Sequence, residues 1–124
     1  MTFRPALQSM NTASEIKAFL RDFKEKMRFW DILFRDDRGK NTQALVDLEI
    51  RPIERKAIIE KLEITDYSEG PLTETLYGGA AMWVFGKTVR KKAVYIKITM
   101  GAMGCSVICI SFHLAQHKMS YPLK

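Results

Sequence analysis

The first part of the chain alternates apolar and polar positions with a helical period. Five apolar side chains recur at the spacing of one helix face: Ile16, Phe19, Leu20, Phe23 and Met27. Thr12 and Glu15 stand just before them in the positions of a capping box, in which each side chain bonds the other residue's backbone N–H. The pattern therefore predicts a helix over residues 13–27 that follows a loose lead-in at residues 1–11.

The residues that follow predict a short strand and a turn. Residues 28–34 are aromatic and bulky, which favours a strand, and residues 36–40 have the composition of a turn. A cation site at Asp36 and Asp37 is disfavoured because no further acidic ligands follow at a recognisable spacing.

Two short helices are predicted next. Asn41 or Thr42 is suited to cap a helix that runs through Leu48. Pro52 is suited to the first turn of another helix, which ends before Ile64. Four apolar residues are expected to form the buried side of this second helix: Ile53, Ala57, Ile58 and Leu62.

From residue 65 onward the pattern changes from helical to extended. Residues 65–71 contain Gly-Pro and predict an irregular segment, and Gly78 and Gly79 mark a second break. Gly86 predicts a bulge within the first strand that follows. Three apolar runs with short connections predict an antiparallel meander: Ala80–Val89, Ala93–Met100 and Cys105–His113. The residues from Leu114 onward predict an irregular tail.

These elements together predict an α+β fold over residues 1–124, a single domain whose N-terminal helices pack on one face of a C-terminal antiparallel sheet. Strand alternation sorts the side chains between the two faces. The helices are expected to cover Val94, Ile96, Ile98 and Met100 in the middle strand, and Ile108, Ile110 and Phe112 in the last. Trp83, Phe85 and Lys87 share one face of the first strand. Tyr95, Lys97 and His113 are expected to share the open face.

Composition narrows the class of protein. A chain of 124 residues with 47% hydrophobic content is long enough to bury a core. No apolar run approaches the roughly 18–20 residues of a membrane span, and the N-terminus lacks a signal-peptide pattern, so we expect a cytoplasmic protein with no membrane partner. Cys105 and Cys109 lie in one predicted strand about 13 Å apart, beyond the roughly 7 Å limit for a disulfide, and are expected to be free core thiols.

The net charge of +6 is divided unevenly along the chain. The last acidic residue is Glu74, and seven Lys and Arg residues follow it with no Asp or Glu. Such sorting favours a polyanionic partner, RNA or DNA first. The structural alternatives are a solvated sheet face or a docking surface for an acidic protein.

The side chains expected on the open face suit cleavage of RNA. In that reaction the 2′-hydroxyl attacks the adjacent phosphate, which requires a base, cations for the developing charge and an acid for the leaving 5′-oxygen. Histidine can donate a proton near pH 7, and aromatic rings can stack bases. The route requires no metal and no cofactor. A zinc-protease site at His113 and His117 is disfavoured, because no Glu follows His113.

Four segments occur in an order that resembles a known family: Asp66–Pro71 (DYSEGP), Met82–Gly86 (MWVFG), Val94–Ile98 (VYIKI) and Cys109–His113 (CISFH). The stretch over about residues 60–124 is similar to the MqsR-type toxins of bacterial type II toxin–antitoxin systems. The resemblance implies a RelE-like fold, a ribosome-independent mRNA endonuclease (a hydrolase) and a cognate antitoxin as partner.

The resemblance transfers catalytic residues only in part. The tyrosine of the family's VYxK motif matches Tyr95. The loop lysine falls at Ser68 or Glu69, the glutamine after the tryptophan at Val84, and the final lysine at His113. The resulting hypothesis makes His113 the general acid, Glu69 the base and Tyr95 an orienting or stacking group.

The phosphate is expected to meet several cations under this hypothesis. Lys87 and Lys97 would hold it, while Arg90, Lys91 and Lys92, in a tight turn, would steer RNA toward the site. Three alternatives remain open. The first is a non-catalytic basic module that binds RNA or an acidic antitoxin, which the missing lysines and glutamine favour. The second is a gyrase poison on a related RelE-like fold, and the third is a small-molecule enzyme.

Overall fold

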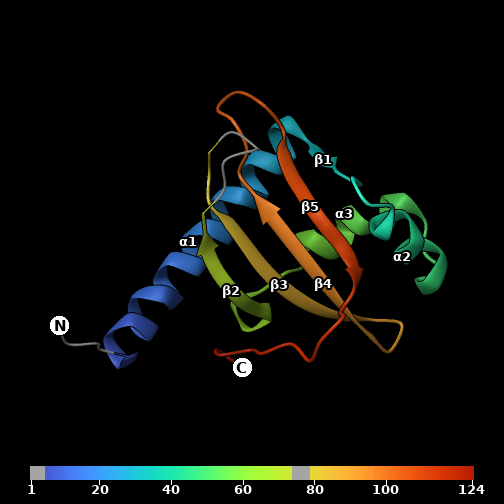
Figure 1. Cartoon of the computed structure of the whole chain (residues 1–124). Coiled ribbons are helices and arrows are strands. Elements are labelled where there is room, and N and C mark those ends of the chain that lie inside the picture. The colour runs from blue at the N-terminus through green and yellow to red at the C-terminus, as the bar shows by residue number, and fades with distance from the viewer. Residues whose placement is uncertain (1–4, 74–78) are drawn as a thin grey trace.

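Within the described residues, 5–73 and 79–124, three helices pack against a five-stranded sheet (Figure 1). The structure is a computed structural model. The helices and one short 3-10 turn are α1 (Pro5–Trp30), α2 (Lys40–Leu48), α3 (Pro52–Glu60) and η1 (Ile64–Asp66). The strands are β1 (Ile32–Phe34), β2 (Tyr67–Leu72), β3 (Met82–Val89), β4 (Lys92–Thr99) and β5 (Val107–Leu114). The predicted α+β class, with N-terminal helices packed on a mostly antiparallel sheet, is confirmed.

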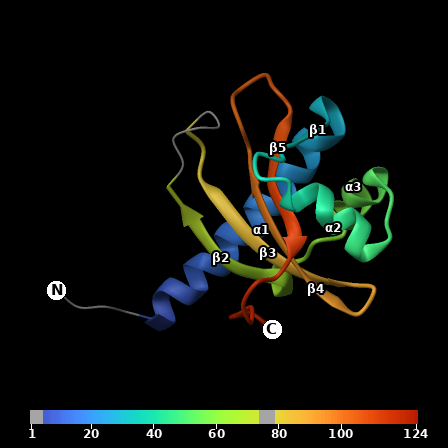
Figure 2. The ribbon, with the colours of Figure 1, turned by 45° about the vertical axis from the view of Figure 1, so that its right-hand side comes forward.

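The strand order is β1-β5-β4-β3-β2. Strands β2 to β5 are antiparallel to their neighbours, which confirms the predicted meander, whereas β1 runs parallel to β5. Arg90 and Lys91 form the two-residue turn between β3 and β4 with φ of 51° and 69°, the left-handed values that a tight hairpin of this twist requires. Figures 1 and 2 show α1 running behind β2, β3 and β4, which leaves the front of the sheet open.

The core lies between α1 and the rear of the sheet. All five apolar residues of the predicted helix face are buried, as are Val94, Ile96 and Ile98 of β4. The ring of Phe19 stacks on that of Trp83 with centroids 4.7 Å apart. Trp83 and Phe85 are both buried on this side. The predicted helix-covered face of the middle strand is confirmed for Val94, Ile96 and Ile98, whereas Met100 is only half-buried.

Helix α1 is longer than predicted at both ends. It begins at Pro5, which fits a first turn because proline has no N–H to leave unpaired, and it passes through Thr12. The predicted capping box and loose lead-in are therefore wrong over the described residues. At the other end the helix continues to Trp30, and Asp31 stops it with φ of 68°. The strand expected at residues 28–34 is reduced to β1.

Two short elements also differ from the predictions. The segment expected to be irregular forms β2, with a cis Gly70–Pro71 bond; proline is tolerated because β2 is an edge strand and its outer side pairs with no described strand. In α3 the expected inward residue Ile53 is 72% exposed, while Ile59 is fully buried. Arg55 lies one turn before Ile59 and its guanidinium sits 3.9 Å from the ring centroid of Phe34, which fixes the face that α3 presents.

The cap of α2 comes from outside the helix. The carboxylate of Asp36 accepts hydrogen bonds from the backbone N–H groups of Asn41 (3.0 Å) and Thr42 (3.1 Å). Neither Asn41 nor Thr42 is the cap, because both already lie within the helix that begins at Lys40. The Asn41 side chain is therefore available for hydrogen bonds to residues outside α2.

Cysteine placement corrects one further expectation. Cys109 is buried in the core, but Cys105 is exposed in the β4–β5 connection, and both are free thiols. Among the described residues, no helix is long and apolar enough to cross a bilayer.

Candidate functional site

A cleft of about 970 Å³ opens on the face of the sheet that the helices leave free. The four strands β2 to β5, the loop before α2 with the first residues of that helix, and the C-terminal segment line it. Its titratable lining is Asp36, Asp37, Arg38, Lys40, Glu69, Tyr95, Lys97, His113, His117 and Lys118. Tyr95 and Lys97, predicted on one strand, His113, predicted on another, and Glu69, predicted in an irregular segment, thus all line one cavity.

Strand register explains how β4 and β5 place their side chains there. Tyr95 lies opposite His113 and Lys97 opposite Ser111, but the next pair is Ile98 with Cys109. Ile110 is therefore the extra residue of a bulge, which shifts the alternation of β5 by one position. The expected inward set of Ile108, Ile110 and Phe112 is wrong for its first two members: Cys109 and Phe112 are buried, whereas Ile108 and Ile110 are only half-buried.

An aromatic pair with a neighbouring cation forms the centre of the cleft. The rings of Tyr95 and His113 are stacked, with centroids 5.2 Å apart and planes 10° from parallel. The Lys97 ammonium lies 5.9 Å from the centroid of the Tyr95 ring. The predicted sharing of one face by these three residues is confirmed.

A backbone contact sets the tautomer of His113. Its Nδ1 lies 3.0 Å from the Leu114 carbonyl oxygen, which can only accept a hydrogen bond. Nδ1 is therefore the donor of this hydrogen bond and carries the proton in the neutral ring.

Burial and a nearby carboxylate keep the Tyr95 phenol protonated. Burial raises the pKa of Tyr95, and the negative charge of Glu69 raises it further. Glu69 itself is exposed on β2 and lies opposite Val84 in the ladder. Tyr95 is accordingly a hydrogen-bond donor and a stacking surface at neutral pH, not a base.

The sequence missed the basic side chains contributed by two other segments. Arg38 comes from the loop before α2 and Lys40 is the first residue of α2, while His117 and Lys118 come from the C-terminal segment. Their positions depend on the parallel pairing of β1 with β5 and on the path of the tail, neither of which leaves a periodic signal. The lining holds three carboxylates and four Lys and Arg side chains, so the cleft is of mixed charge with a small excess of cations.

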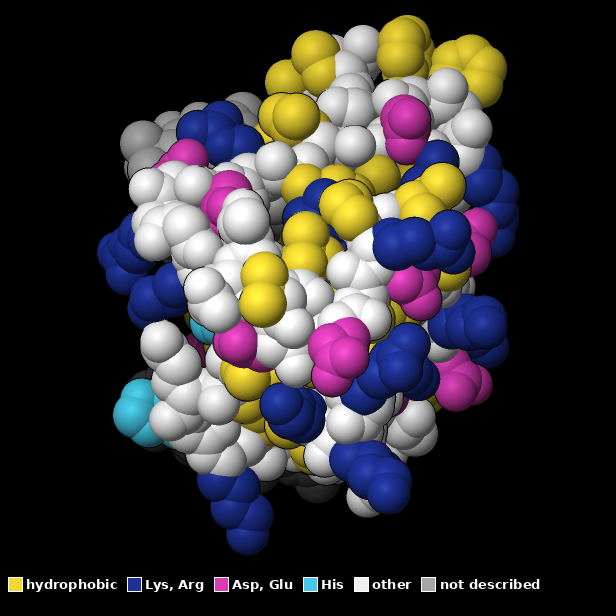
Figure 3. All heavy atoms as spheres, turned by 90° about the vertical axis from the view of Figure 1, so that its right-hand side faces the viewer, with side chains coloured by type: hydrophobic (Ala, Val, Ile, Leu, Met, Phe, Trp, Pro, Cys, Tyr) yellow, Lys and Arg dark blue, Asp and Glu magenta, His cyan; other side chains and the backbone are white. Residues whose placement is uncertain are grey.

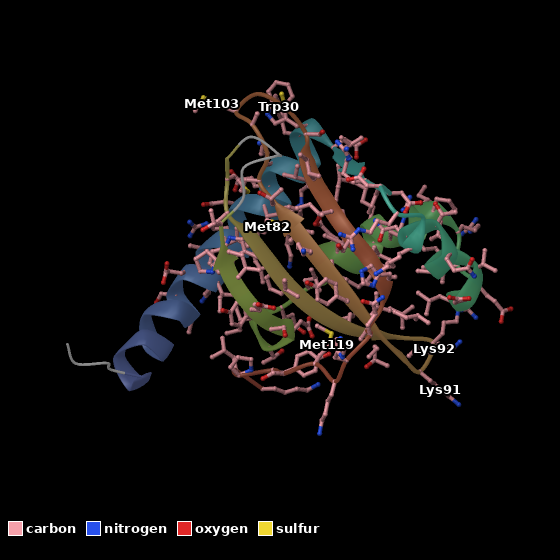
Figure 4. All side chains as sticks on the ribbon, viewed as in Figure 1. Trp30, Met82, Lys91, Lys92, Met103 and Met119 are labelled. Atoms are coloured by element: carbon pink, nitrogen blue, oxygen red, sulfur yellow. The ribbon has the colours of Figure 1, made fainter. Side chains whose placement is uncertain are left out.

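Four of the predicted phosphate contacts lie outside the cleft. Lys87 lies opposite the buried Val94, on the helix side of the sheet, and its ammonium pairs with Asp66 at 2.9 Å. Arg90, Lys91 and Lys92 are exposed at the β3–β4 hairpin tip, where Figure 4 shows Lys91 and Lys92 pointing away from the sheet. Lys97 is the predicted cation that remains in the cleft.

The two positions where the resemblance expects other catalytic residues are also placed. Ser68 lines the cleft, while Val84 is fully buried opposite Lys97. An apolar, buried side chain at the position of the expected glutamine can neither orient nor protonate a substrate there. Among the positions that the resemblance predicts to be catalytic, Tyr95 is the one that carries the expected residue type.

Other faces of the molecule are less specialised. Figure 3 shows the side that carries α2 and α3, where Lys and Arg side chains are interspersed with Asp and Glu. Apolar side chains gather at its upper end, where Figure 4 places Trp30 and Met103. Among the described residues, no three His, Cys, Asp or Glu side chains are grouped as a metal site.

Comparisons with protein-family models, with curated proteins and with solved structures each find no significant match to this chain. The resemblance to MqsR-type toxins thus stays a prediction, and the functional argument rests on the cleft.

Proposed function

We propose that this protein is an endoribonuclease that cleaves single-stranded RNA by acid–base chemistry, and that it acts as an MqsR-like toxin neutralised by a cognate antitoxin. The observation that carries the proposal is the stacked Tyr95–His113 pair beside Lys97, with Glu69 facing the same cleft. These groups supply a proton donor, a cation, an aromatic surface and a carboxylate base within one cavity.

The reaction assigns one role to each group. Glu69 takes the proton of the 2′-hydroxyl, whose oxygen bonds to phosphorus while the bond from phosphorus to the 5′-oxygen breaks. Protonated His113 gives its Nε2 proton to that leaving oxygen, so the products are a 2′,3′-cyclic phosphate and a 5′-hydroxyl. Lys97 balances the phosphorane charge, and Tyr95 donates a hydrogen bond or stacks a base.

The test uses purified protein, EDTA and a labelled RNA with a matched 2′-deoxy oligonucleotide. Cleavage of the RNA alone, with a cyclic phosphate at the new end, is expected. His113→Asn retains a donor toward the Leu114 carbonyl but cannot shuttle a proton, so its rate should fall by about 10²–10⁴ with the melting temperature preserved. An unchanged rate in His113→Asn would remove the acid role.

A second candidate function is a non-catalytic module that binds RNA or an acidic antitoxin through the same cleft. The observation that favours it is Val84, which places an inert buried side chain where the resemblance expects a glutamine. Salt-sensitive binding of both oligonucleotides with no cleavage of either would establish this function instead.

A further inference from the structure

The C-terminal segment crosses the open face of the sheet and contacts β3 at a glycine. Gly86 pairs with Tyr95 in an unbroken ladder, so the bulge expected there is absent. A Cβ atom added at Gly86 would collide with the Tyr121 hydroxyl and would lie 2.8 Å from Met119 Sδ. The missing side chain therefore makes a notch that receives Tyr121 and Met119.

The segment is held at both ends of this crossing. At its start the Ala115 N–H donates to the Ala93 carbonyl at 2.9 Å, which extends the β4–β5 ladder by one bond. Beyond the notch, Leu123 packs against the core, and within the segment itself the Lys124 N–H donates to the Tyr121 carbonyl at 3.1 Å. Residues 116–120 thus span between two anchors, and we call residues 115–124 the C-terminal strap.

The strap supplies one wall of the cleft. His117 and Lys118 are exposed and line the cavity that holds Tyr95, Lys97 and His113. Figure 4 shows Met119 beneath the sheet, on the segment that runs back from the end of β5. A substrate bound over Tyr95 would have Lys97 and His113 on one side and His117 and Lys118 on the other.

We propose that docking of Tyr121 and Met119 in the Gly86 notch positions His117 and Lys118 as contacts for a second phosphate of a bound RNA strand. This inference rests on the proposed RNA substrate and extends it: the site would bind at least two successive phosphates, one at Lys97 and His113 and the next at the strap. Lys118 is a substrate contact, while Gly86 and Tyr121 are positioning residues.

Gly86→Ala tests the positioning directly. Gly86 does not have a positive φ, so alanine is excluded by the strap and not by the backbone. The colliding atoms all belong to the Tyr121 and Met119 side chains and none to the backbone of the sheet, so we expect these side chains to leave the notch and the strap to move while the sheet remains folded. Tyr121→Ala should release the strap in the same way, and Tyr121→Phe, which keeps the ring in the notch, is the matched control.

The first readout needs no RNA. Trypsin should cut after Lys118 at least about tenfold faster in Gly86→Ala and Tyr121→Ala than in the wild type or Tyr121→Phe, because proteolysis requires local release of the backbone. The double variant Gly86→Ala/Tyr121→Ala should be cut no faster than either single variant, since the two substitutions remove the same anchor. Equal rates in the wild type and all four variants would overturn the docked strap.

The second readout measures binding of a 2′-O-methyl RNA decamer, which cannot be cleaved by the proposed route. Gly86→Ala and Lys118→Gln should both weaken binding several-fold and reduce the slope of log K against log salt by about 0.7, the loss of one phosphate contact. A released strap with unchanged affinity and slope would overturn the second-phosphate contact. If the wild type does not bind the RNA at all, both the proposed function and the second-phosphate contact are overturned. The trypsin result would still show whether Tyr121 and Met119 dock in the Gly86 notch.

Discussion

The side-chain carbonyl of Asn41 accepts a hydrogen bond of 2.9 Å from the backbone N–H of Phe112, in the strand that faces the cleft. Its amide nitrogen donates to the carbonyl oxygens of Arg35 and Ile110, the latter at 3.0 Å. The pairing of β1 with β5 ends at Cys109. Beyond that point the buried Asn41 side chain takes the place of a neighbouring strand and bonds the outward-facing backbone groups of β5, at the bulge that turns His113 toward the cleft.

Asn41→Ala should therefore destabilise the fold. The change leaves a buried N–H and a carbonyl of β5 without partners, and each such loss costs about 1–3 kcal/mol. We expect the free energy of unfolding to fall by about 2–4 kcal/mol in urea titrations. Gln43→Ala, which removes an exposed side-chain bond to Asp47 on the same helix, should change it by less than about 0.5 kcal/mol. A loss in Asn41→Ala as small as the control's would contradict the bridging role.

The Asp36 cap should make stability depend on pH. The hydrogen bond from the Thr42 hydroxyl and the bonds from the backbone N–H groups of Asn41 and Thr42 hold the pKa of Asp36 below its usual value. Because the folded-state pKa lies below the unfolded one, the stabilisation is complete above about pH 5 and is lost as the pH falls through the folded value.

Asp36→Ala should cost about 1 kcal/mol at pH 7, the usual contribution of a helix cap, and less below about pH 3. Urea unfolding of wild type and variant across this range measures the difference. A difference that stays constant down to pH 2 would exclude the charged cap.

The two cysteines should react very differently with thiol reagents. Burial raises the pKa of the Cys109 thiol to about 12, so almost none of it is thiolate at pH 8. Cys105 is exposed. Native protein treated with iodoacetamide at pH 8 should gain one adduct, at Cys105, and denatured protein two. Rapid double labelling of native protein, read by mass spectrometry, would show that β5 is less tightly packed than described.

The sequence predicted the order and pairing of the long strands better than it predicted which face of the sheet each side chain occupies. The meander was readable because three apolar runs are joined by short polar turns. His113 was correctly predicted to lie on the open face. The strict alternation of side chains assumed along the last strand nevertheless fails at Ile110, an apolar residue that gives no sequence sign of a bulge. That bulge is bridged by Asn41, a residue distant in sequence, and long-range pairings of this kind leave no local pattern.

Lys87 shows a second limit of sequence reasoning. Its sharing of a face with Trp83 and Phe85 was predicted correctly, yet that face is the one the helices cover. A lysine at the end of such a face can form an ion pair with a nearby carboxylate, and Lys87 does so with Asp66 of η1. Net charge counts alone could not separate this paired lysine from the Lys97 of the cleft.

Charge coupling between Tyr95 and Glu69 should be visible in a phenol titration. Burial and then the Glu69 charge raise the Tyr95 pKa. In wild type, the absorbance of Tyr95 at 295 nm should rise above the usual range near pH 10, and Tyr95→Phe identifies its step by difference. Glu69→Gln removes one cause, so the step should move to lower pH without reaching the ordinary value. A step that does not move would place the carboxylate too far from the phenol for its proposed role.

Lys97 and Lys87 provide a direct comparison between the cleft and the rear of the sheet. Lys97→Gln removes a cation beside the Tyr95 ring, and we expect weaker binding of a 2′-O-methyl RNA, with the slope of log K against log salt reduced by about 0.7. Lys87→Gln removes the partner of a mostly buried Asp66 carboxylate and should instead cost about 1 kcal/mol of stability. Its RNA affinity and salt slope should match the wild type, because its ammonium lies on the other face. If Lys87→Gln lowers the slope as much as Lys97→Gln does, RNA contacts the helix side as well, and the open cleft is not the whole binding surface.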